Sequence, residues 1–246
     1  MDTRNLLLKI QYDGSGYHGY QIQPNAITVQ EVIEEVLSDI TREEIHINGC
    51  SRTDAGVHAI EYACSFNTVF PIPAERLPIV LNGKLPPDIK ALSCCEMETD
   101  FHARFDTKAK TYRYRINTAK DTDVFSRNHE WQIHRQLDVF KMKEACKHFV
   151  GEMDFASFMT KGNDVKSTVR TVYSLEIEQN GEIIDIFITA NGYLYNMVRI
   201  ITGTLTQVGL GRISPDDIPK IISSCNREEA GPTAPPQGLY LYKVIY

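Results

Sequence analysis

Apolar residues recur along this chain with two different periods, and the order of those periods constrains the fold more than any other feature. Residues 4–12 carry apolar side chains at every second position, which predicts a strand. Thr28 and Glu31 then form a capping box, and apolar residues follow at helical spacing as far as Ile40. The chain therefore begins with a strand and a helix, in that order.

The same reading continues to the end of the chain. It gives the first hundred residues the order strand, helix, strand, strand, helix, strand, with strands at 44–48, 60–66 and 88–97 and a helix that begins at Pro73. Beyond residue 100 we expect strands at 110–117 and 129–134 and a helix over 137–150 that ends at Gly151. A hairpin of 169–178 and 182–190 follows, with its turn around Asn180-Gly181. A helix from 193, a shorter helix capped by Ser214-Pro215 and a strand at 239–246 complete the prediction. The pattern predicts two α+β halves joined near residue 100.

The composition is that of a globular protein, with 42% hydrophobic and 24% charged residues, and no apolar run approaches the length of a membrane span. The N-terminal run of three leucines, closed by Lys9, is too short for the apolar core of a signal peptide. The six cysteines include no C-x-x-C pair and none has zinc-like spacing from a histidine. We therefore expect a cytoplasmic protein without a membrane segment or a structural metal.

The net charge of −6 argues against a protein wrapped in nucleic acid, whose binding surface is usually basic. Local distribution matters more than the sum, because Lys108, Lys110, Arg113 and Arg115 crowd together. A basic groove on an acidic protein is compatible with this pattern.

Two short motifs suggest enzyme classes that the surrounding sequence excludes. "GSGYHG", from Gly14 to Gly19, matches the G-x-G-x-x-G dinucleotide pattern, but a segment containing Pro24 separates it from the next helix. These glycines are better explained by a loop that lets a backbone pass close by. "DAG" at Asp54 does not match the D-[ST]-G element of aspartic proteases, which also need two equivalent loops.

The stretch "GCSRTDAGVHA" places Arg52 and Asp54 among small residues, between two predicted strands. Such a loop can present a carboxylate with room for a ligand beside it. The same aspartate could instead cap a turn, and the residues alone leave both interpretations open. His58, which follows in the same loop, is interpreted as structural.

This stretch resembles the signature loop of the tRNA pseudouridine synthase A family, and the resemblance extends along nearly the whole chain. "YDGSGYHGYQIQPNAITVQ", "DFHARFDTKAKTYRYRI", "NGYLYNMVRIITGTLTQVG" and "TAPPQGLYLYKVIY" resemble the other family motifs, in family order. Position by position, the resemblance implies that Asp54 is the catalytic aspartate and Tyr112 the tyrosine that stacks on the substrate. It implies that Arg52 binds substrate and that Arg199 pairs with the carboxylate. Members often carry glycine where this chain has Ser51, a small residue that suits a turn.

The residues alone leave the roles of Tyr112 and Arg199 open. Tyr112 and Tyr114 share one face of a predicted strand, and a buried core explains Tyr114 best, while Arg113 and Arg115 on the other face either hold phosphates or meet water. On a helical wheel Arg199 falls among polar residues, which by itself favours a solvated face. The resemblance favours a polar face lining the catalytic cleft.

The family resemblance also implies a fold, a reaction and partners. The fold is α+β, an antiparallel sheet flanked by helices in two ferredoxin-like halves, here 1–101 with the aspartate loop and 102–246 with Tyr112 and Arg199. The reaction isomerises uridine to pseudouridine at tRNA nucleotides 38, 39 and 40 in the anticodon stem-loop, by base flipping and without a cofactor. The protein would act as a homodimer, and Asp54 would attack the ribose, attack the base or start an elimination. The alternative is a non-catalytic RNA-binding or RNA-folding protein on the same scaffold.

Overall fold

The computed structural model describes residues 3–121, 123–160 and 165–246. Its internal contacts divide the chain into two compact units. The first contains the residues up to Lys108 together with Tyr240–Tyr246, and the second contains Ala109–Leu239. The last residues of the chain are thus grouped with the first hundred. None of the described helices is long and apolar enough to cross a membrane.

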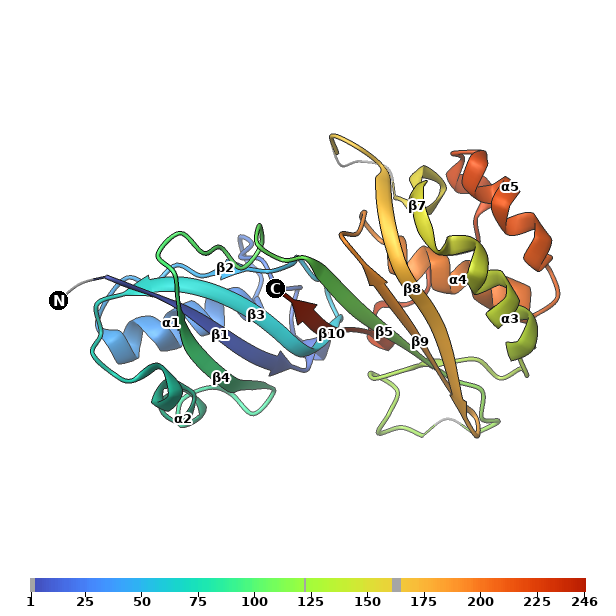
Figure 1. Ribbon diagram of the computed structural model, residues 1–246. Coiled ribbons are helices and arrows are strands. Elements are labelled where there is room, and N and C mark those ends of the chain that lie inside the picture. Colours follow the sequence, from blue (N-terminus) through green and yellow to red (C-terminus); the bar gives the residue numbers. More distant parts are fainter. Residues whose placement is uncertain (1–2, 122, 161–164) are drawn as a thin grey trace. The chain divides into compact units, whose positions relative to one another are not determined.

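The first unit is a split βαββαβ arrangement. It consists of β1 (Arg4–Tyr12), α1 (Val29–Thr41), β2 (Asn48–Gly49), β3 (His58–Thr68), α2 (Leu77–Asn82) and β4 (Ile89–Met97). The strands lie in the order β4-β1-β3, with β2 also paired to β3, and all of these pairings are antiparallel. This is the ferredoxin-like order that the family resemblance implies (Figure 1).

The final strand, β10 (Leu239–Ile245), adds a short parallel pairing to β3. The α1 helix begins as predicted, with the hydroxyl of buried Thr28 accepting from the amide of Glu31, and it ends at Arg42 in the left-handed region (φ 61°). The apolar face of β1 is fully buried, as the alternation of its residues predicts; Leu6, Leu8 and Ile10 are each 0% exposed.

The second unit also combines strands with helices, but three strands lie between its first two α-helices. It contains β5 (Ala109–Asn117), β6 (Trp131–Gln132), α3 (Val139–Cys146), β7 (Gly151–Asp154), β8 (Val169–Asn180), β9 (Ile183–Ala190), α4 (Met197–Gly209) and α5 (Ile218–Ser223). Antiparallel pairing gives the order β5-β9-β8-β7, and β6 is a short parallel addition to β5. Helices α3 and α4 pack against one another, α3 on β8 and α4 on β5 (Figure 1). The predicted α+β class is confirmed, with a mixed rather than a purely antiparallel sheet.

Several predicted boundaries are wrong. The strand expected at 44–48 is reduced to β2, and the one expected at 129–134 to β6. The α3 helix begins after Asp138, whose carboxylate caps Lys141, and it tightens into a 3-10 turn at Lys147–Phe149. Gly151 is therefore not a helix cap but the first residue of β7.

The predicted hairpin is confirmed, but its turn lies one residue later than expected. Asn180 pairs with Ile183, so the turn is formed by Gly181 and Glu182, and Gly181 has a positive φ of 60°. Positive φ at the first turn position suits glycine and fits the twist of two paired strands. The helix expected from 193 begins at Met197, after Asn196 in the left-handed conformation.

Candidate active site

The Asp54 loop comprises residues 50–57 and connects β2 to β3 in the first unit. Its ends are fixed by main-chain hydrogen bonds, with the amide of Cys50 donating to Ala63 (2.9 Å) and that of Val57 to Asp54 (3.1 Å). The second bond closes a turn in which Gly56 has a φ of 75°. Arg52 is exposed and Asp54 is half-buried. The loop thus presents both charged side chains from a fixed backbone.

The segment Gly14–Gly19, which matches the dinucleotide pattern and is called the glycine loop below, lies directly against the Asp54 loop. A Cβ atom at Gly14 would lie 2.0 Å from the carbonyl oxygen of Val57, and one at Gly19 would lie 2.6 Å from that of Thr53. The amide of Tyr20 donates to the same Thr53 oxygen (3.1 Å). The expectation that these glycines admit a close backbone is confirmed, and that backbone is the Asp54 loop itself.

Three buried tyrosines, Tyr12, Tyr20 and Tyr62, form what we call the tyrosine cluster beneath the Asp54 loop. The rings of Tyr20 and Tyr62 are stacked at 4.3 Å, and Tyr12 lies 5.7 Å from Tyr62. The hydroxyl of Tyr62 donates to the main-chain oxygen of Ser51, and that of Tyr12 bonds to the hydroxyl of Thr53 (2.8 Å). Burial raises the pKa of Tyr20 and of Tyr62 well above the ordinary value. Both phenols therefore stay protonated at neutral pH.

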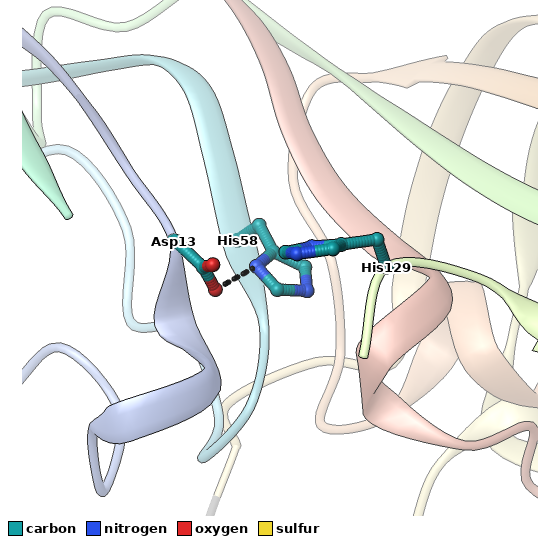
Figure 2. Close-up of side chains that lie close together, drawn as sticks. All are labelled: Asp13, His58 and His129. Carbon is teal, nitrogen blue, oxygen red and sulfur yellow. Dashed lines mark ion pairs between the residues drawn. The ribbon is translucent and has the colours of Figure 1, made fainter. Parts of the chain in front are cut away.

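His58 lies at the start of β3 and is 1% exposed. Its Nδ1 accepts from the amide of Gly14 (3.0 Å) and lies 3.1 Å from a carboxylate oxygen of Asp13 (Figure 2). Its ring stacks on Tyr240 of β10 with centroids 4.7 Å apart. These contacts support the interpretation of His58 as a structural residue that joins the glycine loop, β3 and β10. His129, also drawn in Figure 2, belongs to the second unit.

Tyr112 lies on β5 in the second unit, opposite Ile188 of β9, and is buried. Its ring meets the edge of Tyr193 at a centroid distance of 4.9 Å. The Tyr193 hydroxyl donates to the main-chain oxygens of Lys110 (2.7 Å) and Ile188 (2.8 Å), which locks the ring that supports Tyr112. Sequence reasoning missed this support. The residue concerned, Tyr193, is the first tyrosine of "NGYLYN", and the periodicity of that stretch does not indicate that Tyr193 contacts β5.

The other predictions for β5 have different outcomes. Tyr114 is fully buried and its hydroxyl donates to the main-chain oxygen of Pro235 (2.7 Å), so its assignment to the core is confirmed. Arg115 binds Asp185 of β9 through two nitrogens, at 2.9 and 2.7 Å, and Arg113 lies 3.8 Å from the same carboxylate. Asp185 was not singled out in the sequence. The arginine face of β5 is therefore an ion-paired surface rather than a solvated one.

Arg199 lies in the first turn of α4 and is half-buried. Its Nε donates to the main-chain oxygen of Ala234 and its Nη1 to the side chain of Asn196, both at 2.7 Å. The helical wheel favoured a solvated face here, and that reading is wrong. Thr202 and Thr206 on the same face are 1% and 2% exposed.

The four predicted site residues are thus divided between the units. Arg52 and Asp54 share one loop of the first unit, and Tyr112 and Arg199 lie on β5 and α4 of the second. Contacts within their own units include the Val57–Asp54 main-chain bond, the Tyr112–Tyr193 ring contact and the Arg199–Asn196 bond. The pairing of Arg199 with Asp54 stays a prediction.

Comparison with known proteins gives a consistent result along the chain. A family model described as tRNA pseudouridine synthase matches residues 9–106 and 145–246. Arg52, Asp54 and Arg199 fall inside the matched segments, and Tyr112 falls between them.

Full-length relatives cover the intervening segment as well. The chain is 48% identical over 243 residues to tRNA pseudouridine synthase A of Thermoanaerobacter sp. (strain X514), covering 99% of this chain and 100% of the relative. It is 46% identical, with the same coverage, to the tRNA pseudouridine synthase A of Caldicellulosiruptor bescii. Among solved structures, an archaeal box H/ACA sRNP Nop10-Cbf5 complex aligns with 92% of this chain and 59% of that chain, at 12% identity and a TM-score of 0.37. The family assignment therefore rests on the family model and on the relatives that are similar in sequence.

Proposed function

Because this chain belongs to the tRNA pseudouridine synthase family and is an isomerase that converts uridine in tRNA to pseudouridine, we propose that Asp54 is its catalytic carboxylate. We propose that its targets are the uridines at nucleotides 38, 39 and 40 of the anticodon stem-loop. The observation that carries the assignment of Asp54 is its loop, in which a half-buried carboxylate stands on a backbone held by β3, the glycine loop and the tyrosine cluster.

The reaction explains why a fixed carboxylate is needed. The bond between N1 of uracil and the ribose carbon breaks, and a bond from C5 to the same carbon forms, so no atom is gained or lost. Attack at the ribose, attack at the base and elimination all require an ionised group held at a base that has left its stack. A carboxylate fixed by its own loop meets that requirement without a cofactor.

We assign the remaining site residues to substrate binding. Tyr112 stacks on the flipped uracil, a contact worth about 1–3 kcal/mol. Arg52, which is exposed beside Asp54, binds the RNA backbone, and Arg199 pairs with the Asp54 carboxylate. In this proposal the half 1–101 supplies the carboxylate and the half 102–246 supplies Tyr112 and Arg199.

We further propose that the protein acts in the cytoplasm as a homodimer. Two copies bring two sets of basic side chains to one tRNA, which helps a chain with a net charge of −6 to bind a polyanion. The non-catalytic RNA-binding alternative gains no support from the relatives described above, which are named as synthases.

Substitution of Asp54 by asparagine tests the central assignment. Wild type and Asp54→Asn are incubated with unmodified tRNA, and pseudouridine is mapped along the anticodon arm. We expect product at nucleotides 38–40 with wild type and none with Asp54→Asn, which should bind tRNA with wild-type affinity. Asp39→Asn is the matched control, because Asp39 lies on α1 and pairs with Lys84 and Arg42. Equal product from wild type and Asp54→Asn would refute the role of Asp54, and product elsewhere in the tRNA would refute the proposed positions.

A further inference from the structure

The tyrosine cluster contacts the Asp54 loop on both sides of Arg52. On one side, the Tyr62 hydroxyl donates to the main-chain oxygen of Ser51 at 2.5 Å. On the other side, the Tyr12 hydroxyl bonds to the hydroxyl of Thr53 at 2.8 Å, while the amide of Tyr20 donates to the main-chain oxygen of Thr53 at 3.1 Å. All three tyrosines belong to the first unit, as does the loop.

These contacts fix the peptide units next to the two charged residues. Thr53 directly precedes Asp54, and Ser51 directly precedes Arg52. Arg52 therefore lies between two held residues and Asp54 directly follows one, which leaves the backbone of both little freedom to shift along the loop. The tyrosine cluster therefore acts on the backbone positions of Arg52 and Asp54 through Ser51 and Thr53.

A tyrosine is needed at position 62 for its hydroxyl as well as for its ring. Tyr62 is 0% exposed, and the stacked ring of Tyr20 and the tilted ring of Tyr12 surround it. A phenylalanine would retain this packing and lose the bond to Ser51. Because burial keeps the pKa of Tyr62 high, the hydroxyl remains a donor across the physiological range.

Gly49 supplies an independent observation. A Cβ atom there would lie 2.1 Å from the Tyr62 hydroxyl oxygen and 2.5 Å from a ring carbon of Tyr20. The glycine that opens "GCSRTD" thus leaves the space that this hydroxyl occupies. The bond from Tyr62 to Ser51 thus depends on glycine at position 49 as well as on tyrosine at position 62.

We propose that Tyr62, assisted by Tyr12, is a positioning residue that sets the place of Arg52 and Asp54 through Ser51 and Thr53. The proposal deepens the proposed function and rests on the role given there to Asp54. A group that acts on a flipped base must be held close to its productive geometry, since a displacement of about 1 Å can cost about a hundredfold in rate. Loss of the Tyr62 hydroxyl should therefore slow the chemical step more than it weakens tRNA binding.

The test compares hydroxyl deletions in the full-length protein. Tyr62→Phe and Tyr12→Phe are measured for kcat, KM and tRNA dissociation constant, together with unfolding in urea. Tyr246→Phe is the matched control, because its hydroxyl also donates to a main-chain oxygen in the first unit, that of Ala103 at 2.8 Å, outside the Asp54 loop. We expect Tyr62→Phe to lower kcat at least about tenfold, and to raise KM and the dissociation constant by a clearly smaller factor.

The outcomes separate this proposal from a general loss of stability. If Tyr62→Phe and Tyr246→Phe lose similar stability but only the first loses kcat, the positioning role holds. If the folded Tyr62→Phe protein turns over at the rate of Tyr246→Phe, or if KM rises while kcat is unchanged, the proposal is wrong. Should Tyr62→Phe fail to fold, Tyr12→Phe is judged by the same criteria. Asp54→Asn in the same assay reports separately on the proposed function, because its result does not depend on the cluster.

Discussion

Gly14 and Gly16 lie in the same 3-10 turn and differ in what surrounds them. A Cβ atom at Gly14 would overlap the carbonyl of Val57, with the oxygen at 2.0 Å and the carbon at 2.7 Å. A Cβ atom at Gly16 would meet no described atom within 4 Å. The first glycine is therefore required by the Asp54 loop, whereas the second is required by no neighbour in the described part of the chain.

Alanine substitutions at the two glycines should accordingly give different results. We expect Gly14→Ala to lower the free energy of unfolding by about 2–4 kcal/mol, because a rigid backbone has to move. Gly16→Ala should change it by less than about 1 kcal/mol. Urea denaturation of both variants measures the difference. Equal stability of the two proteins would mean that the glycine loop and the Asp54 loop are not packed as described.

At the scale of elements, α4 is bound along its length by a segment that follows it in the chain. Ala234 and Arg199 exchange two hydrogen bonds, from the Ala234 amide to the Arg199 carbonyl and from the Arg199 side chain to the Ala234 carbonyl. The Thr204 hydroxyl accepts from the amide of Gly231 at 2.9 Å. Gly203 permits this approach, since a Cβ atom there would lie 1.7 Å from the oxygen of Pro232.

Substitution of Gly203 by alanine tests this arrangement through the sign of its effect. Glycine to alanine inside a helix normally stabilises a protein by about 1 kcal/mol. Here we expect Gly203→Ala to destabilise by about 2 kcal/mol or more, because the segment at 231–234 must move away. Displaced Ala234 would also release Arg199, so turnover should fall as well. Denaturation and turnover measured on the same preparation check both effects, and a variant more stable than wild type would contradict the packing.

Local patterns predicted the elements that depend on local chemistry. The cap at Thr28, the alternation in β1 and the glycine in the β8–β9 turn act within a few residues, and each was read correctly or within one position. The helical wheel alone favoured a solvated face for Arg199, because it cannot show that residues 231–234, far along the chain, lie against α4. Periodicity reports which side chains share a face, but not what lies against that face.

The candidate site shows the same limit. Asp54 was located by its loop and by family resemblance, and the structure places it on such a loop. The groups that hold this loop were not found, because Tyr12 and Tyr62 meet Thr53 and Ser51 across 41 and 11 residues of sequence. Asp185 was missed for the same reason, since it meets Arg115 across 70 residues. Partners at such separations leave no periodic signal.

At the scale of the whole molecule, the last residues of the chain complete the first unit near its candidate site. Tyr240 and Leu241 pair with His58 and Ala59 at the start of β3, directly after the Asp54 loop. The amide of Lys108 donates to the oxygen of Ile245 at 2.8 Å, which fixes the end of the same strand. The chain thus returns from the second unit to support the segment that carries the proposed carboxylate.

Charge is also a property of the whole chain, and it makes the salt dependence of tRNA binding informative. A net charge of −6 repels RNA at long range, and Arg115 of the basic cluster is already paired with Asp185. Affinity must therefore come from a few local phosphate contacts.

Three such contacts give a slope of log K against log salt of about −2.7, or a loss of about 40-fold between 50 and 200 mM KCl. Filter binding over this range should show that loss. Arg115→Gln should leave the slope unchanged, and affinity that barely responds to salt would contradict binding through phosphates.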